Sequence, residues 1–179
     1  MQNLNYGVIG NCSTAALISE KGAIEWLCFP EFDSPSVFAA ILDRQKGGHF
    51  GFKVTSDYKV TQSYVPHTNI LSTHFESEEG AFDVVDFMPC YPTSDGKDFY
   101  RPAEIYRYIR WAKGRPRMKV DYRPAPNYAR GKTIYNVTSQ YVETYSSVEN
   151  KDRQYLYSSL DLKKVVNHDE ITLEKDEFF

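Results

Sequence analysis

The sequence has few of the features that mark disulfide-rich, zinc-binding, secreted or membrane proteins. Its 179 residues include three cysteines, Cys12, Cys28 and Cys90, with no CxxC spacing, which argues against both a disulfide framework and a zinc site. No apolar run approaches the roughly 20 residues that a membrane span needs, and the first residues have neither the basic nor the apolar region of a secretory signal. We therefore expect a cytoplasmic protein with reduced thiols and no membrane partner.

The motifs of common enzyme classes are also missing. The sequence contains no phosphate-binding glycine-rich loop, no GxSxG and no HExxH. Its four histidines, His49, His67, His74 and His168, are scattered along the chain, which favours structural roles over metal ligation. Acidic residues number 24, but their spacing selects no acid–base pair. We predict no catalytic residue, no metal site and no cofactor in this chain.

What the sequence does have is a strong strand signal. It contains 14 tyrosines and 11 phenylalanines, and aromatic residues favour pleated, half-buried surfaces. Short turns with glycine, 20–22 and 79–80, separate segments in which apolar and polar residues alternate, and 113–116 is a further turn. The alternating segments are 14–19, 23–28, 69–78, 81–88, 105–111, 118–122, 138–146, 154–160 and 171–175. This pattern predicts an all-β, antiparallel sandwich or barrel.

Helical signal is weak. Residues 36–43 follow Asp33-Ser34-Pro35, a sequence that can cap and start a helix of about two turns. We predict one short helix there, within a single domain that covers residues 1–179. Residues 171–179 resemble a turn followed by the start of another apolar strand, so we expect the domain to be truncated.

The most distinctive segment leaves a predicted strand at Trp26 and runs to Ser36. One interpretation is a rigid loop that closes an end of the sandwich, with Asp33 or Ser34 capping the short helix. The other is a surface for domain docking or a pocket rim, because aromatic side chains offer flat apolar faces. The candidate residues for that second role are Trp26, Phe29, Pro30, Phe32, Asp33 and Ser34.

Positive charge is concentrated in one part of a chain whose net charge is −3. Residues 101–132 contain ten Lys or Arg and two acids. Arginines interleaved with Tyr and Trp can bind nucleic acid, but these charges fall in turns and at alternating strand positions. We interpret the stretch as a solvated sheet face and predict no nucleic-acid partner.

Several blocks, in order along the chain, resemble the opening of bacterial family 15 glycoside hydrolases of the glucoamylase and trehalase-like kind. The similarity extends over about residues 6 to 130. Departures are small: Glu25 stands where the family usually has Asp, and 11–13 replaces a turn that usually contains glycine. The blocks are 6–10, 14–17, 22–28, 32–38, 47–50, 64–71, 84–89, 107–110 and 122–130.

The resemblance implies a fold and a role that composition does not show. In this family the N-terminal domain is a large antiparallel β-sandwich, of the supersandwich type, followed by a linker and an (α/α)₆ barrel. The barrel carries two glutamates that hydrolyse α-glucosidic bonds with inversion, which needs the carboxyl groups about 6.5–9.5 Å apart. Those glutamates have no matching position in this sequence, so no catalytic residue is transferred to it.

We therefore expect a non-catalytic domain that packs against the barrel of the same polypeptide. The substrate of the whole enzyme would be an α-glucan, an isomaltooligosaccharide or trehalose. Two alternatives stay open: a free-standing carbohydrate-binding module that uses Trp26 and Trp111 as stacking platforms, and a nucleic-acid-binding β protein built on residues 101–132.

Overall fold

The computed structural model describes residues 5–54, 57–148 and 153–175. Of these, 48% lie in strands and 4% in helix, so the predicted all-β class is confirmed and the strand content exceeds the usual 20–25%. The elements are β1 (Tyr6–Gly10), β2 (Ala15–Ser19), β3 (Ile24–Cys28), β4 (Ser36–Phe38), β5 (His49–Val54), β6 (Lys59–Tyr64), β7 (Leu71–Glu76), β8 (Gly80–Phe87), β9 (Tyr91–Pro92), β10 (Phe99–Tyr100), β11 (Tyr106–Gly114), β12 (Arg117–Arg123), β13 (Thr133–Val137), β14 (Val142–Ser146), β15 (Gln154–Leu156), α1 (Leu162–Asn167) and β16 (Ile171–Thr172).

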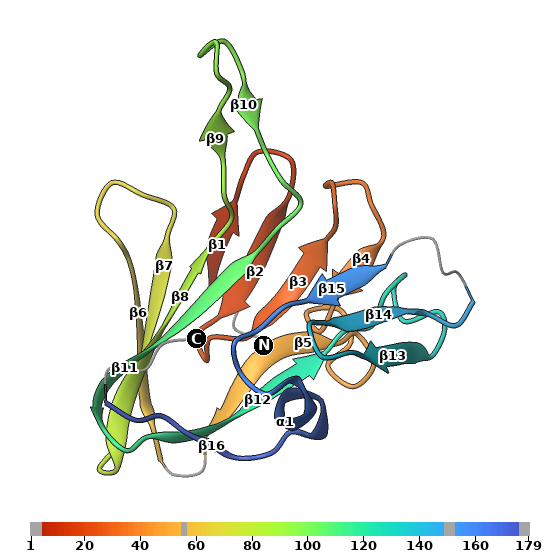
Figure 1. Cartoon of the computed structure of the whole chain (residues 1–179). Helices are drawn as coiled ribbons and strands as arrows, with labels where there is room; N and C mark the ends of the chain where they lie inside the picture. The colour runs from red at the N-terminus through yellow and green to blue at the C-terminus, as the bar shows by residue number, and fades with distance from the viewer. Residues whose placement is uncertain (1–4, 55–56, 149–152, 176–179) are drawn as a thin grey trace.

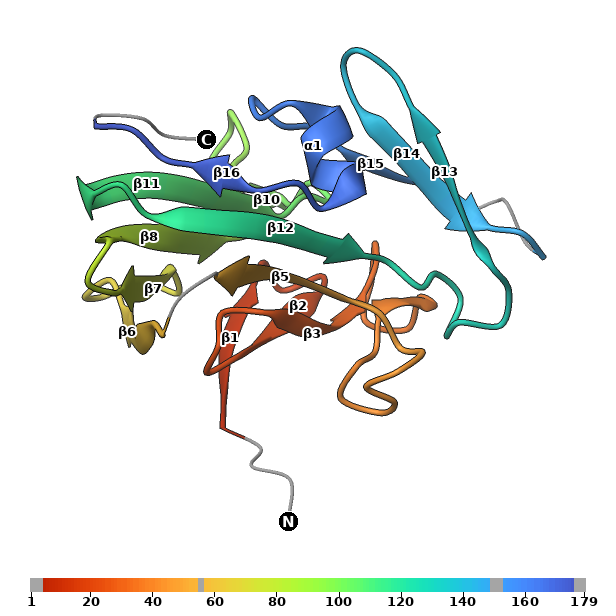
Figure 2. The same ribbon diagram turned by 90° about the horizontal axis from the view of Figure 1, so that it is seen from below.

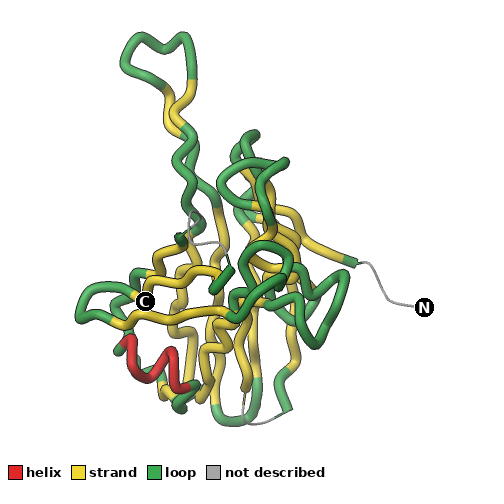
Figure 3. Tube along the Cα trace, turned by 90° about the vertical axis from the view of Figure 1, so that its right-hand side faces the viewer, coloured by secondary structure: helices red, strands yellow, loops and turns green. Residues whose placement is uncertain are grey.

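Two antiparallel sheets form the body of the molecule (Figure 1). The large sheet has the order β1-β2-β3-β5-β12-β16, with β4 paired to β3, and the small sheet has the order β11-β8-β7-β6. A further sheet, β13-β14-β15, stands beside the end of β12 and is called the wing here (Figure 2). The hairpin β9–β10 is called the arm, because it projects away from the body in two perpendicular views (Figures 1 and 3).

The predicted hairpins form where alternation and turn residues agree. β2 pairs with β3, and β7 pairs with β8, each antiparallel. Gly22, in the turn between β2 and β3, has a φ of +74°, and a Cβ there would come within 2.9 Å of the Phe75 ring. A glycine is required at this point for both reasons.

The core lies between the two body sheets. Along β7 buried and half-buried residues alternate, as the period of two predicts. The rings of Phe75 on β7 and Phe82 on β8 stack with centroids 4.6 Å apart. The largest side chains that are fully buried include Phe75, Phe82, Ile9, Ile18, Ile24 and Leu71.

The predicted turn at 113–116 connects the two sheets instead of closing a hairpin. β11 pairs with β8 in the small sheet, whereas β12 pairs with β5 in the large sheet. Gly114 has a φ of +66°, and a Cβ there would lie 2.4 Å from the carbonyl oxygen of Glu79. The turn therefore fixes how one sheet lies over the other.

The predicted helix at 36–43 is wrong. Ser36–Phe38 form β4, and all three residues are buried. The chain then enters the segment between β4 and β5, where Ala39 N–H donates to the Gly47 carbonyl at 2.7 Å. A helix would place one side of residues 36–38 in water, whereas pairing with β3 buries all three of them.

The short helix lies elsewhere, at α1. The Asp161 side chain accepts a hydrogen bond from Lys163 N–H at 2.9 Å, and Leu162 and Val165 are buried. Neither Asp33 nor Ser34 caps a helix, so that interpretation is also wrong. Among the described residues no helix has the length and apolar character needed to cross a membrane.

Candidate functional site

Loops that are far apart in sequence are tied together at one end of the sandwich, called the loop end here. Phe32 N–H donates to the Ser13 carbonyl at 3.0 Å, which joins the β3–β4 loop to the β1–β2 loop. The side chain of Asn11, in the same β1–β2 loop, donates to the Pro102 carbonyl at 3.0 Å at the base of the arm. These bonds hold the loops and the arm in one arrangement (Figure 1).

Inside the β3–β4 loop a tight turn projects an aromatic side chain into solvent. Glu31 N–H donates to Ser34 Oγ at 3.1 Å, and Ser34 N–H donates to the Glu31 carbonyl at 3.2 Å. Phe32, between them, is 61% exposed, and Asp33 is exposed as well. The Glu31–Ser34 bonds close the turn and the Phe32 N–H bond to Ser13 ties it to the neighbouring loop, so Phe32 is presented on a pre-formed surface.

The remaining candidate residues divide between surface and core. Pro30 is exposed, whereas Trp26 is half-buried in β3 opposite Leu17. Phe29 is partly buried and packs against the hydrophobic core. The exposed candidates are therefore Pro30, Phe32 and Asp33, while Trp26 and Phe29 belong partly to the sandwich.

The arm adds exposed aromatic side chains that the sequence interpretation missed. Tyr91 and Phe99 are each 51% exposed and Tyr100 is 63% exposed, on strands paired between Tyr91 and Tyr100. Asp95-Gly96 between two aromatic segments is a hairpin signal that could have identified it. Exposed rings gathered on a projecting hairpin are typical of a surface that contacts another protein or domain.

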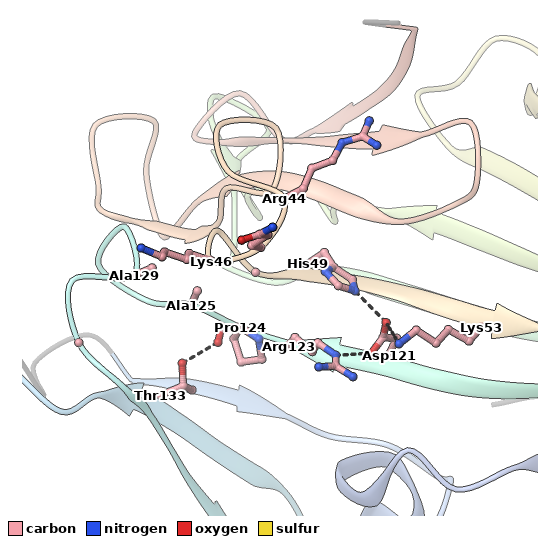
Figure 4. A pocket seen from close by; sticks show the side chains of 13 residues that line it. Arg44, Lys46, His49, Lys53, Asp121, Arg123, Pro124, Ala125, Ala129 and Thr133 are labelled. Atoms are coloured by element: carbon pink, nitrogen blue, oxygen red, sulfur yellow. Dashed lines mark hydrogen bonds and ion pairs between the residues drawn. The ribbon is translucent and has the colours of Figure 1, made fainter. Parts of the chain in front are cut away.

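A second cluster surrounds the carboxylate of Asp121 on β12, beside a cavity of about 470 Å³ (Figure 4). The Asp121 side chain is 4% exposed. It accepts a hydrogen bond from Arg123 Nε at 2.6 Å, pairs with Lys53 Nζ at 3.0 Å, and lies 2.8 Å from His49 Nε2. His49 and Lys53 come from β5, so the cluster holds the two neighbouring strands together.

The pKa of Asp121 reflects two opposing effects. Burial raises it, but the hydrogen bonds from Arg123, His49 and Lys53 outweigh that rise and hold the pKa of the carboxyl well below its usual range. Asp121 is therefore ionised and neutralises its basic neighbours. This arrangement holds β5 and β12 together. In the part of the chain that the structure describes, no group of His, Cys, Asp and Glu could hold a metal ion.

Arg107 is buried, contrary to its predicted place on a solvated face. Its side chain is 4% exposed and that of its partner Asp86 is 0% exposed. Arg107 Nε and Nη2 donate to the two Asp86 oxygens at 2.8 and 3.1 Å. The guanidinium also donates to the carbonyls of Gly22 and Phe50. One side chain of the small sheet thus binds the backbone of the large sheet, because β11 turns this position inward.

The rest of the basic stretch is largely neutralised by acids from other segments. Arg110 pairs with Asp83, and Arg115 pairs with Glu174. Seven of the ten basic residues form ion pairs, namely Arg101, Arg107, Arg110, Lys113, Arg115, Arg117 and Arg123. Most of these charges serve contacts between strands.

Comparison with known proteins identifies what these loops and strands are part of. The sequence model of a family described as "Trehalase-like, N-terminal" matches residues 5–150. The chain belongs to this family. The match includes the loop end, the arm and every strand of the body sheets except β16, and it confirms the resemblance at the level of the domain.

Several curated proteins similar to this trehalase-like N-terminal chain are named trehalases. The "Trehalase" of Thermoplasma volcanium is 36% identical over 132 residues, which are 72% of this chain and 20% of that protein. The "Trehalase" of Thermoplasma acidophilum is 33% identical over 155 residues, 85% of this chain and 26% of that protein. "Trehalase 1" of Sulfolobus acidocaldarius is 51% identical over 85 residues, 46% of this chain and 14% of that protein.

The chain spans about a quarter or less of the length of these relatives. It thus corresponds to one part of these longer proteins. No solved structure shows significant similarity to it.

Proposed function

We propose that the chain is the non-catalytic N-terminal domain of a cytoplasmic glycoside hydrolase of family 15, which cleaves terminal α-linked glucose with inversion. Trehalose is the first substrate to test, and α-glucans and isomaltooligosaccharides are the alternatives. The observation that carries the proposal is the match to trehalases over 72% and 85% of this chain but only 20% and 26% of theirs. The exposed free thiols of Cys12 and Cys90 fit a reducing compartment.

The role of the domain is to pack against the catalytic barrel of the same polypeptide through the loop end. Phe32 and the arm residues Tyr91, Phe99 and Tyr100 supply the apolar area. Hydrogen bonds between the loops hold this surface in place before docking, so little conformational entropy is lost when the barrel binds. Trp26 and Phe29 support the surface from below.

The experiment compares residues 1–179 with the longer protein that the gene encodes. Only the longer protein is expected to hydrolyse trehalose, with maltose and p-nitrophenyl α-glucoside as the comparison substrates. Turnover by purified residues 1–179 above the buffer rate would contradict the proposal. A longer protein that is inactive on all α-glucosides would contradict it as well.

Docking is tested in the longer protein with Phe32→Ala combined with Tyr100→Ala. We expect a lower melting temperature and a lower kcat/KM for the best substrate, while residues 1–179 carrying the same changes stay folded. Val148→Ala, in the segment after β14 and at a site that is 65% exposed, is the matched control and should change neither value. Equal behaviour of the two variants would show that the loop end does not contact the barrel.

A further inference from the structure

The two faces of the wing differ in what they contact. Thr144 on β14 turns towards the body, where its Oγ1 lies 3.3 Å from the Tyr122 hydroxyl. Glu143, the preceding residue, is directed to the opposite face, because successive side chains of a strand alternate. Antiparallel pairing sets Glu143 opposite Asn136 on β13 and opposite Tyr155 on β15. These three side chains therefore share one face, called the outer face of the wing here (Figure 2).

Three tyrosine rings adjoin one another at one end of the outer face. Tyr141 contacts Tyr155 with ring centroids 5.4 Å apart, and it contacts Tyr157 with ring centroids 5.6 Å apart. Tyr155 is 48% exposed and Tyr157 is 67% exposed. The three rings thus present apolar area to solvent, and we call them the tyrosine platform.

A cluster of hydrogen-bonding groups around Glu143 borders the tyrosine platform. One oxygen of Glu143 accepts from Arg153 Nη1 at 2.6 Å and from the Tyr155 hydroxyl at 3.2 Å. The Asn136 amide donates to the other oxygen at 3.3 Å. The Arg153 guanidinium also lies 4.7 Å from the centroid of the Tyr145 ring, a cation–π contact that orients it. The cluster is therefore held in place, and the charge of Glu143 is balanced by that of Arg153.

This combination suits a neutral ligand that carries many hydroxyl groups. The C–H face of a sugar ring is apolar and packs well on an aromatic ring, while its hydroxyls both donate and accept hydrogen bonds. The Arg153 side chain is 39% exposed, so hydroxyls can reach it. An apolar partner would take water from this guanidinium without replacing its hydrogen bonds, which is costly. A strongly charged ligand would meet a cluster whose own charges already cancel.

The inclination of the rings indicates which kind of sugar chain fits. The Tyr141 ring is inclined by 80° to that of Tyr155 and by 57° to that of Tyr157. Coplanar rings match the flat ribbon of a β-linked glucan. Inclined rings match an α-linked glucan, in which successive sugar rings turn relative to one another. The tyrosine platform is therefore shaped for a curved chain.

We infer that the tyrosine platform and the Glu143 cluster bind an oligosaccharide of α-linked glucose. Sugar rings pack against Tyr155 and Tyr157, and their hydroxyls bond to Arg153 and Asn136. The choice of glucose rests on the proposed function, whereas the polyhydroxyl class and the curved shape rest on the outer face itself. The site holds a glucan chain on the domain and is separate from the loop end.

The tryptophans that the sequence suggested as stacking platforms are less suited to this role. Trp26 is half-buried in β3. Trp111 packs partly against the core, and its indole N–H donates to the Gly114 carbonyl at 2.9 Å. The wing tyrosines expose more of their rings, and they have hydrogen-bonding groups beside them.

The test is titration of residues 1–179 with maltoheptaose, followed by calorimetry and by the NMR signals of the tyrosine rings. We expect saturable binding at millimolar concentrations, with the largest shifts on the tyrosine platform. Cellohexaose, the β-linked comparison, should bind about tenfold more weakly. Absence of saturable binding would overturn the inference, and equal affinity for the two sugars would overturn the assignment to an α-glucan. No turnover is measured, so this result and the hydrolysis test of the longer protein can fail independently.

Variants of matched exposure show whether the tyrosine platform is responsible. Tyr157→Ala should weaken maltoheptaose binding at least about tenfold, because a central aromatic ring supplies much of the binding free energy. Tyr157→Phe keeps the ring and should bind as the wild type does. Tyr100→Ala on the arm, at a site that is 63% exposed, should leave the affinity unchanged. Equal weakening by the two alanine variants would overturn the inference. Self-association without sugar that Tyr157→Ala abolishes would also overturn it, because a second copy would then occupy the outer face.

Discussion

Arg107 is the residue on which the contact between the two body sheets depends most directly. Its guanidinium binds Asp86 and two backbone carbonyls, and it lies 4.7 and 4.9 Å from the ring centroids of Phe50 and Phe52. Complete burial raises the pKa of Asp86, and the positive charge of Arg107 counteracts that rise. Burying the two charges opposes folding, but removing one of them lowers stability further, because the remaining buried charge then has neither a partner nor water around it.

Arg107→Leu should lower the free energy of unfolding by about 3–5 kcal/mol, since it leaves Asp86 buried without a counter-charge. Arg110→Leu is the control. Its pair with Asp83 involves an arginine that is 58% exposed, and such pairs contribute below about 1 kcal/mol. Urea unfolding of both variants measures the difference. Similar losses would show that Arg107 does not bridge the sheets in solution.

Asp121 gives a prediction about pH. Its folded pKa lies below the unfolded value of about 3.9, so its stabilisation is present above about pH 4 and is lost as the pH falls below that value. Asp121→Asn should reduce stability by about 1–3 kcal/mol at pH 7, and the difference from wild type should shrink towards pH 2. Urea unfolding at pH 7, 4 and 2.5 tests this. A difference that is constant with pH would contradict the role given to the charge.

At the scale of elements, the β3–β4 loop divides into a supporting part and a presented part. Phe29 packs against the core, whereas Phe32 extends from a turn that Glu31 and Ser34 close with their own hydrogen bonds. The sequence interpretation treated both rings alike, because both lie in the same proline-containing segment after a predicted strand. Only the tertiary structure distinguishes the two rings, because it places the hydrophobic core next to Phe29 and not next to Phe32.

Phe29→Ala should destabilise residues 1–179 by about 1–3 kcal/mol, less than the about 3–5 kcal/mol of a fully buried phenylalanine. Phe32→Ala should change stability by less than about 0.5 kcal/mol, as surface substitutions usually do. Thermal and urea unfolding of the two variants measure the contrast. If Phe32→Ala is the more costly change, the loop is part of the core and the docking proposal loses its main residue.

At the scale of the whole molecule, acids and bases from distant segments combine. Glu76, Glu79 and Glu174 supply partners to Lys113, Arg117 and Arg115 respectively. A stretch that is strongly basic in sequence is therefore mixed in charge on the folded surface. This arrangement leaves less positive charge available for phosphates than the composition implies.

Binding of a single-stranded oligonucleotide should accordingly be weak and depend little on salt. If all ten basic residues contacted phosphates, the slope of log affinity against log salt would be about −7. With seven of them already in ion pairs, we expect a slope no steeper than about −2. Titration between 50 and 200 mM salt, the usual range for such measurements, distinguishes the two values.

The sequence by itself determined the features that depend on near neighbours. Alternation and glycine turns identified the all-β class and the hairpins β2–β3 and β7–β8, because strand period and turn geometry are local properties. The ordered blocks between residues 6 and 130 identified the family. The sequence also singled out the β3–β4 loop, but it did not show which residues of that loop pack against the core and which are exposed.

Only the tertiary structure decided what depends on distant partners. Residues 36–38 have a good helix start before them, yet they form a strand, because β3 offers paired hydrogen bonds and complete burial. Arg107 alternates in sequence with Tyr106 and Tyr108 and shares a strand face with Ile109, but only the structure shows that its partners are Asp86 and the backbone of the large sheet. A cavity of about 1290 Å³ is lined by residues 103–109 and 153–160 among others, and no local pattern of residues records that these two segments lie around the same space.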